Sequence, residues 1–112
     1  MRSTIQMLMA GAVVALWGLP ATAQDAKVAR GAELFAAQKC TICHAVAGKG
    51  NVKHPLDGTG ARVSADMIKM WLTDPKGAEA KAGEKAMPPM KSFASLPPED
   101  IDALVAYVLS LK

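Results

Sequence analysis

This sequence has little net charge, few aromatic residues and no apolar run long enough to span a bilayer comfortably. Thirteen basic side chains stand against ten acidic ones, which gives a formal net charge of +3. No stretch of basic residues is interleaved with aromatic residues, so the composition argues against a nucleic-acid-binding protein. The most apolar segment, residues 5–19, is shorter than the roughly 20 residues that a transmembrane helix needs.

Residues 1–23 are predicted to form a secretory signal peptide. Arg2 supplies the positive charge, residues 5–19 are mostly apolar, and residues 21–23 read Ala-Thr-Ala, an A-x-A cleavage site. Cleavage after residue 23 would leave residues 24–112 as a single exported domain, with no stable membrane insertion. The alternative is that the segment stays uncleaved and serves as a membrane anchor.

Aromatic residues are scarce in the predicted mature domain, where only Phe35, Trp71, Phe93 and Tyr107 remain. A chain this short buries too little surface to be robust without a staple or a cofactor. We therefore expect an underfilled core that a large apolar cofactor would complete, and a poorly folded chain in its absence.

The pattern of apolar residues predicts helices and loops, with no convincing strand. Three helices are expected, at about residues 25–38, 64–73 and 99–111. Gly31 lies inside the first of them, where a glycine usually allows another backbone to approach closely. The loops that connect the helices are long for so small a domain, and such loops are uncommon unless they are functional.

Both cysteines lie in the stretch KCTICHAVAG, residues 39–48. A closed zinc site needs about four ligands. Beyond this stretch the chain has no further cysteine and one further histidine, His54, which is more simply interpreted as an exposed loop histidine. A thioredoxin-like dithiol follows a strand, and no strand is predicted before Cys40. The spacing C-x-x-C-H favours covalent haem attachment, with both thiols on one porphyrin edge and the adjacent imidazole at the iron.

The order of motifs over residues 24–112 resembles class I cytochrome c of the small monohaem bacterial type. The resemblance is carried by the opening GAELF, then CTICH, then HPLDGTGARVSADMIKMWLTDPKG, and finally MPPMKSF with EDIDALVAYVLSLK. It implies an all-α fold, the small cytochrome c fold, with three main helices and long loops wrapped around one covalently attached haem c. One departure is that Phe35 precedes Cys40 by five residues, where four are common in the family.

The resemblance also implies roles for individual residues around the haem. Cys40 and Cys43 are expected to form the thioether bonds, and His44 is expected to be the proximal iron ligand. The carbonyl of Pro55 is expected to accept a hydrogen bond from the second ring nitrogen of His44, which would orient the imidazole and raise its basicity. Trp71 is expected either to donate its indole N–H to a haem propionate or to serve as part of the core alone.

The sixth iron ligand is expected from the segment KAMPPMKSF, which holds two methionines in a stiff, proline-rich loop. Met90 is favoured because it precedes Tyr107 by 17 residues and Phe93 by three, and both distances resemble those of the family. Met87 is the alternative, since it stands directly before a proline as the ligand does in many relatives.

The function that the resemblance implies is the transfer of single electrons between redox proteins in the periplasm. The chain would act as a free carrier or as the haem subunit of a larger oxidoreductase, and not as an enzyme. The alternative is a haem enzyme or sensor, peroxidase-like or gas-binding, which would need an open sixth position and polar distal groups. Lysines gather in the two long loops, where they would either steer an acidic redox partner to the haem edge or simply be solvated: Lys49, Lys53, Lys76, Lys81, Lys85 and Lys91.

Overall fold

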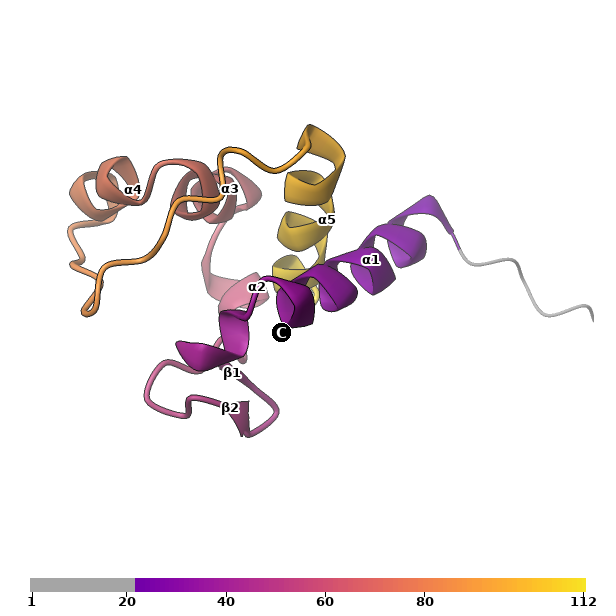
Figure 1. The fold of residues 1–112 in the computed structure, drawn as a ribbon, viewed down its shortest axis with the longest axis horizontal. Helices are drawn as coiled ribbons and strands as arrows, with labels where there is room; N and C mark the ends of the chain where they lie inside the picture. Colours follow the sequence, from indigo (N-terminus) through magenta and orange to yellow (C-terminus); the bar gives the residue numbers. More distant parts are fainter. Residues whose placement is uncertain (1–21) are drawn as a thin grey trace, which may run out of the picture.

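The computed structural model describes residues 22–112, so the predicted signal peptide, residues 1–23, lies almost wholly outside the described part. From residue 22 onwards the elements are, in chain order, α1 Ala23–Ala37, the 3₁₀ helix η1 Cys40–Ile42, β1 Ala45–Val46, β2 Lys49–Gly50, α2 Thr59–Arg62, α3 Ala65–Thr73, α4 Pro75–Ala82 and α5 Pro98–Leu109. None of these helices is long and apolar enough to cross a membrane. The described part of the chain is a mostly helical domain, as the sequence predicts (Figure 1).

Helices α1 and α5, the first and last of the described chain, cross at Gly31 (Figure 1). A Cβ atom at this position would collide with the carbonyl oxygen of Ala103 and would lie 2.5 Å from Cβ of Tyr107. One turn later the rings of Phe35 and Tyr107 meet with their centroids 5.3 Å apart and their planes tilted by 59°. The prediction that Gly31 admits a neighbouring backbone is therefore confirmed.

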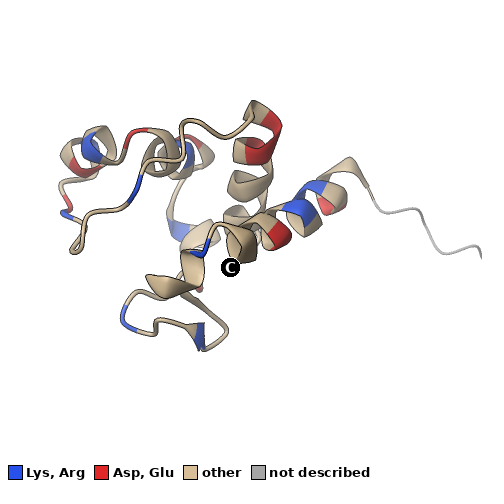
Figure 2. Cartoon of the chain, in the orientation of Figure 1, with Lys and Arg blue, Asp and Glu red and all other residues tan. Residues whose placement is uncertain are grey.

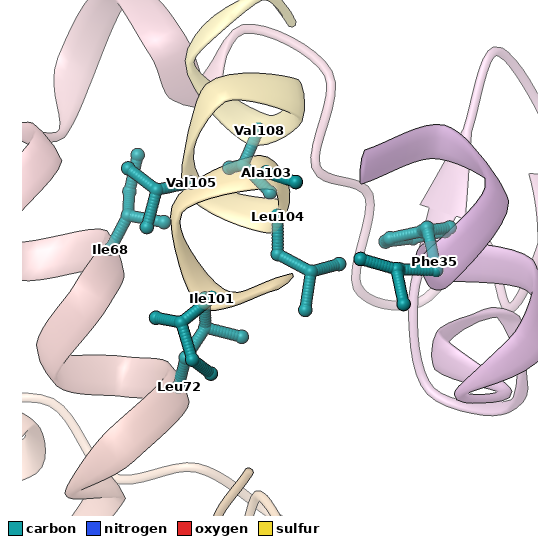
Figure 3. Close-up of a cluster of buried hydrophobic side chains, with 9 residues drawn as sticks. Phe35, Ile68, Leu72, Ile101, Ala103, Leu104, Val105 and Val108 are labelled. Atoms are coloured by element: carbon teal, nitrogen blue, oxygen red, sulfur yellow. The ribbon is translucent and has the colours of Figure 1, made fainter. Parts of the chain in front are cut away.

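Helix α5 lies between α1 and α3 and supplies most of the core. Figure 3 shows Leu104 directed toward Phe35 on one side, while Val105 and Ile101 face Ile68 and Leu72 of α3 on the other. The side chain of Leu104 is almost completely buried, with 1% of its surface exposed. The apolar faces of α3 and α5 thus pack against each other.

Four short elements lie in segments that the sequence analysis assigned to loops. Two antiparallel pairs, Ala45 with Gly50 and Val46 with Lys49, make the small ladder of β1 and β2. Helix α2 is a single turn, and α4 extends for eight residues after α3. The expectation of three helices joined only by irregular loops was therefore too simple, although α1, α3 and α5 begin and end within two residues of their predicted limits.

Helix α4 exists because its caps are strong rather than because it has an apolar stripe. The Asp74 carboxylate accepts a hydrogen bond from the Gly77 N–H at 3.1 Å, and Pro75 occupies the first turn, where its missing N–H costs nothing. Gly83 ends the helix in the left-handed region, with φ of 67°. Pro75 thus follows the end of α3 and starts α4.

The chain leaves α1 for the cysteine turn through a left-handed residue, Lys39. Helix α1 ends at Ala37, and Lys39 then adopts the left-handed conformation with φ of 60° before η1 begins. An L-residue pays for this conformation with a steric clash of its Cβ, which is why glycine is usual there. The five residues from Phe35 to Cys40 thus contain the end of α1 and one left-handed residue before the cysteine turn.

Candidate functional site

Cys40 and Cys43 lie on a single turn formed by η1 and the residue after it. Hydrogen bonds from the backbone N–H groups of Cys43 and His44 both reach the carbonyl oxygen of Cys40, at 3.2 and 2.8 Å. Both thiols are free, with Cys40 half-buried and Cys43 exposed. Burial is the main cause that raises the pKa of the Cys40 thiol, and the charge of Cys43 adds to it. The turn thus brings two thiols and one imidazole close together in the chain.

The ring of His44 is half-buried and held by one backbone carbonyl. Its Nδ1 lies 3.2 Å from the carbonyl oxygen of His54, which can only accept a hydrogen bond. The proton of the neutral ring therefore belongs on Nδ1, and Nε2 keeps its lone pair. Burial lowers the pKa of His44, although the His54 carbonyl opposes this shift. A neutral imidazole with one nitrogen fixed and the other available is the form that ligates a metal.

The carbonyl beside Nδ1 of His44 is that of His54, one residue before the Pro55 carbonyl that was expected there. The segment around Pro55 runs parallel to Ala45, with Ala45 N–H donating to His54 O at 3.2 Å and Leu56 N–H donating to Ala45 O at 2.8 Å. Because successive carbonyls of an extended chain point in opposite directions, the His54 carbonyl faces His44 and that of Pro55 faces away. The imidazole of His54 is exposed, as expected for a loop histidine.

Two polar side chains that the sequence analysis did not single out tie together the segments around His44: Asn51 contacts the cysteine turn and Asp57 contacts the turn between β1 and β2. The Asn51 side chain donates to the carbonyl of Ile42 at 3.3 Å, and its backbone N–H lies 3.0 Å from Thr41 O. The Asp57 carboxylate accepts a hydrogen bond of 2.9 Å from the N–H of Ala47, a residue in the left-handed region with φ of 52°. Short polar residues in a glycine-rich loop were the available signal, because such side chains commonly bond to nearby backbone.

The two methionines of the second long loop differ in their surroundings. Met90 is half-buried and packs against the hydrophobic core, whereas 63% of the surface of Met87 is exposed. Phe93, three residues after Met90, is tied to α3 by a hydrogen bond of 2.7 Å from its N–H to the carbonyl of Leu72. Of the two methionines, Met90 is thus the one that takes part in the packing around the core.

A set of apolar side chains contacts the core on one side and keeps the rest of its surface accessible. Its members come from the cysteine turn, the loops that follow it and the methionine loop: Cys40, Val46, Leu56, Val63, Met90, Phe93 and Leu96. Burying their remaining surface would contribute roughly 25 cal/mol for each Å² removed from water. Each of these partly buried side chains keeps apolar surface that a large apolar group could cover.

Trp71 lies half-buried on α3, outside the cluster that forms the core. Within residues 22–112 its indole nitrogen makes no hydrogen bond to protein, and no buried polar side-chain atom of this region lacks a partner. The indole N–H is thus reachable from solvent, so the side chain combines an apolar body with an available donor.

Comparison with protein families decides between the chemistries that the cysteine spacing allows. A family model described as Cytochrome c matches residues 28–112. The chain belongs to the cytochrome c family. No curated protein and no solved structure matches it.

Family membership explains the features of the turn and of the lining. Two cysteines on one turn, followed at once by a histidine with an available nitrogen, fit one covalently attached haem c. The mostly helical domain is that of a small cytochrome c. Haem-based electron transfer is the function that the family implies, and its members are typically electron carriers rather than enzymes.

Proposed function

We propose that this cytochrome c is a monohaem protein that carries single electrons between redox partners in the periplasm, as a free carrier or as the haem subunit of a larger oxidoreductase. The observation that supports it best is the half-buried Met90 in a loop packed on the core, together with the neutral, oriented His44. Two such residues would fill both axial positions of an iron. An iron with both axial positions filled can exchange electrons but has no open position for a substrate.

Each residue of the site has a defined part in this proposal. Cys40 and Cys43 would hold the haem by thioether bonds, and Nε2 of His44 with the sulfur of Met90 would ligate its iron. When bound, the haem supplies an iron that gains or loses one electron. The His54 carbonyl holds the proton of Nδ1 and so fixes the orientation and basicity of the imidazole.

The remaining lining residues act by excluding water and by holding the rim of the haem. Phe93 and Leu96 pack against the core next to Met90 in the chain, which is an apolar setting and not the polar one that a peroxidase-like or gas-binding site would need. Trp71 would offer its indole N–H to a propionate. A thioether ligand in apolar surroundings favours the reduced iron, so we expect a positive reduction potential.

Partner docking is proposed at the surface formed by η1 and the loop after β2. Ile42 and Val52 each expose 67% of their surface there, and the lysines beside them in the chain, Lys49 and Lys53, are also exposed. The acidic first turn of α5 lies at the other end of the molecule (Figure 2). An exposed apolar centre with basic neighbours suits an acidic redox partner that docks near the haem edge.

Optical spectroscopy of the purified protein tests the proposed ligation. In-gel haem staining after denaturing electrophoresis should give a band at the mass of the mature chain, because thioether bonds survive denaturation. The oxidised protein should be low spin at neutral pH and show the weak far-red band of sulfur-to-iron charge transfer. Haem that extracts into acid-acetone would contradict covalent attachment, and high-spin ferric haem would support the enzyme or sensor instead.

The docking surface is tested with an anionic redox reagent such as hexacyanoferrate. Oxidation of the reduced protein should slow down as salt is added, because screening weakens the attraction of the reagent to the lysines. The double variant Lys49→Glu, Lys53→Glu should react more slowly and lose much of this salt dependence. A matched control replaces Lys27 and Lys112, both exposed and away from this loop in the sequence, by Glu. Equal effects of the two double variants would show that only net charge matters.

A further inference from the structure

The chain reverses direction around a single residue, Glu79, before it enters the methionine loop. The backbone carbonyl of Glu79 accepts hydrogen bonds from Gly83 N–H, which ends α4, and from Glu84 N–H at 3.2 Å. The carboxylate of the same residue then accepts a hydrogen bond from Ala86 N–H at 3.2 Å. Glu79 and Ala86 are both half-buried, so the contact is partly shielded from water. Glu79 thus binds three amide groups of the returning segment, two through its backbone carbonyl and one through its carboxylate.

The far end of the methionine loop is fixed on α3. Phe93 N–H donates to Leu72 O at 2.7 Å, and the Ser92 hydroxyl donates to Thr73 O at 3.2 Å. Between these anchors, residues 87–91 make no hydrogen bond to the rest of the described chain. The segment that carries both methionines is therefore held by hydrogen bonds only at its two ends, while Met90 packs against the core between them. Its near attachment is the carboxylate of Glu79, since Ala86 directly precedes Met87.

We propose that Glu79 is a positioning residue that keeps the sulfur of Met90 at the haem iron by anchoring the entrance of the methionine loop. This inference rests on the proposed ligation by Met90. The two prolines between the methionines are stiff, so a displacement at Ala86 is transmitted along the loop instead of being absorbed by it. A hydrogen bond to a carboxylate is stronger than one to a neutral acceptor, which suits an anchor that a single side chain provides.

The anchor is tested by the rate at which the oxidised, haem-loaded protein binds imidazole. An external ligand binds only when the methionine sulfur leaves the iron, so the binding rate at low imidazole reports how often the loop opens. Glu79→Ala should bind imidazole about tenfold faster than the wild type, which corresponds to about 1.4 kcal/mol of lost anchoring. Glu79→Gln keeps an acceptor oxygen without the charge and should be accelerated less, by about threefold.

The matched control is Glu84→Ala. Glu84 is an exposed carboxylate five residues further along the same chain reversal, and its side chain makes no hydrogen bond among the described residues. Its removal changes the net charge as Glu79→Ala does but should leave the imidazole rate at the wild-type value. Equal acceleration in both variants would overturn the proposal, because charge alone would then explain it.

The outcomes separate this inference from the ligation on which it rests. A wild type without the far-red band, or a Met90→Ala variant that keeps it, would refute Met90 as the ligand. With both results as expected, a Glu79→Ala protein that binds imidazole at the wild-type rate would refute the anchor alone. Should Glu79→Ala fail to accumulate with haem, hydrogen exchange of the wild type decides. The Ala86 amide should exchange about tenfold more slowly than that of Lys85, which has no acceptor here, and equal exchange would overturn the proposal.

Discussion

Replacing Gly31 by alanine tests the crossing of α1 and α5 most directly. Helix propensity predicts a more stable protein, whereas the collision of the added Cβ with α5 predicts a less stable one. Alanine inside a helix is favoured over glycine by about 1 kcal/mol, so helix propensity alone predicts a more stable protein. The added Cβ would collide with the carbonyl oxygen of Ala103 and lie 2.5 Å from Cβ of Tyr107. Both atoms belong to, or are fixed by, the backbone of α5, and neither can turn away as a flexible side chain would.

The steric term should therefore exceed the propensity term. Overpacking typically costs about 1–3 kcal/mol, and a collision with backbone lies at the upper end of this range. Subtracting the gain in propensity leaves a net loss of about 2 kcal/mol in the free energy of unfolding. For a domain of this size the loss corresponds to a fall in Tm of about 10 °C.

Urea unfolding of the haem-loaded protein, followed by circular dichroism, measures the change. The control is Ala32→Gly at the next position, which is exposed and should lose only the propensity term of about 1 kcal/mol. The Phe35–Tyr107 contact should loosen in Gly31→Ala because the helices must separate. A Gly31→Ala protein as stable as the wild type, or more stable, would refute the tight crossing.

Three further predictions concern the ligand, the turn before the cysteines and the response to pH. Met90→Ala should abolish the far-red band, lower the reduction potential and admit external ligands. Met87→Ala should keep the band and lose at most about 1 kcal/mol of stability, since Met87 is exposed. The reverse pattern would make Met87 the ligand. Lys39→Gly should raise the free energy of unfolding by about 1 kcal/mol because glycine adopts positive φ without a clash, and an unchanged urea midpoint would contradict the left-handed turn. Burial, with a smaller contribution from Asp57, raises the pKa of Tyr107, so stability should fall as the pH rises above the ordinary tyrosine value of about 10. Tyr107→Phe should show a shallower loss over the same pH range in parallel urea titrations, and identical slopes would contradict this role.

The sequence predicted the elements whose residues carry their own signals. Ser64 caps α3, with its hydroxyl accepting from Met67 N–H at 3.2 Å, and the apolar stripe that follows ends in the core. Gly31 indicated a close contact because glycine destabilises the interior of a helix and usually stands there to let another backbone approach. The C-x-x-C-H motif indicated its chemistry because the spacing itself brings the two thiols and the imidazole onto one turn.

What the sequence could not show depends on contacts between segments. The hydrogen-bond partner of His44 differs by one residue from the expectation, because the pairing of Ala45 with the segment around Pro55 sets which carbonyl faces the ring. Helix α4 has only Ala78 buried and no stripe to detect. The bond from Ala86 N–H to the carboxylate of Glu79 follows from the chain reversal at Gly83, which no short motif records.

The crossing at Gly31 joins the two ends of the chain, and this has a consequence for the order of folding. Helix α1 begins at Ala23 and α5 ends at Leu109, so their contact closes a loop that contains almost the whole domain. Bringing segments of such long sequence separation together costs chain entropy, which the packing of the two helices has to offset. A chain made from its N-terminus exposes Cys40 and Cys43 before α5 exists. The crossing therefore cannot form until the residues of α5 have been made, and until then both thiols lie in a chain that this contact has not yet closed.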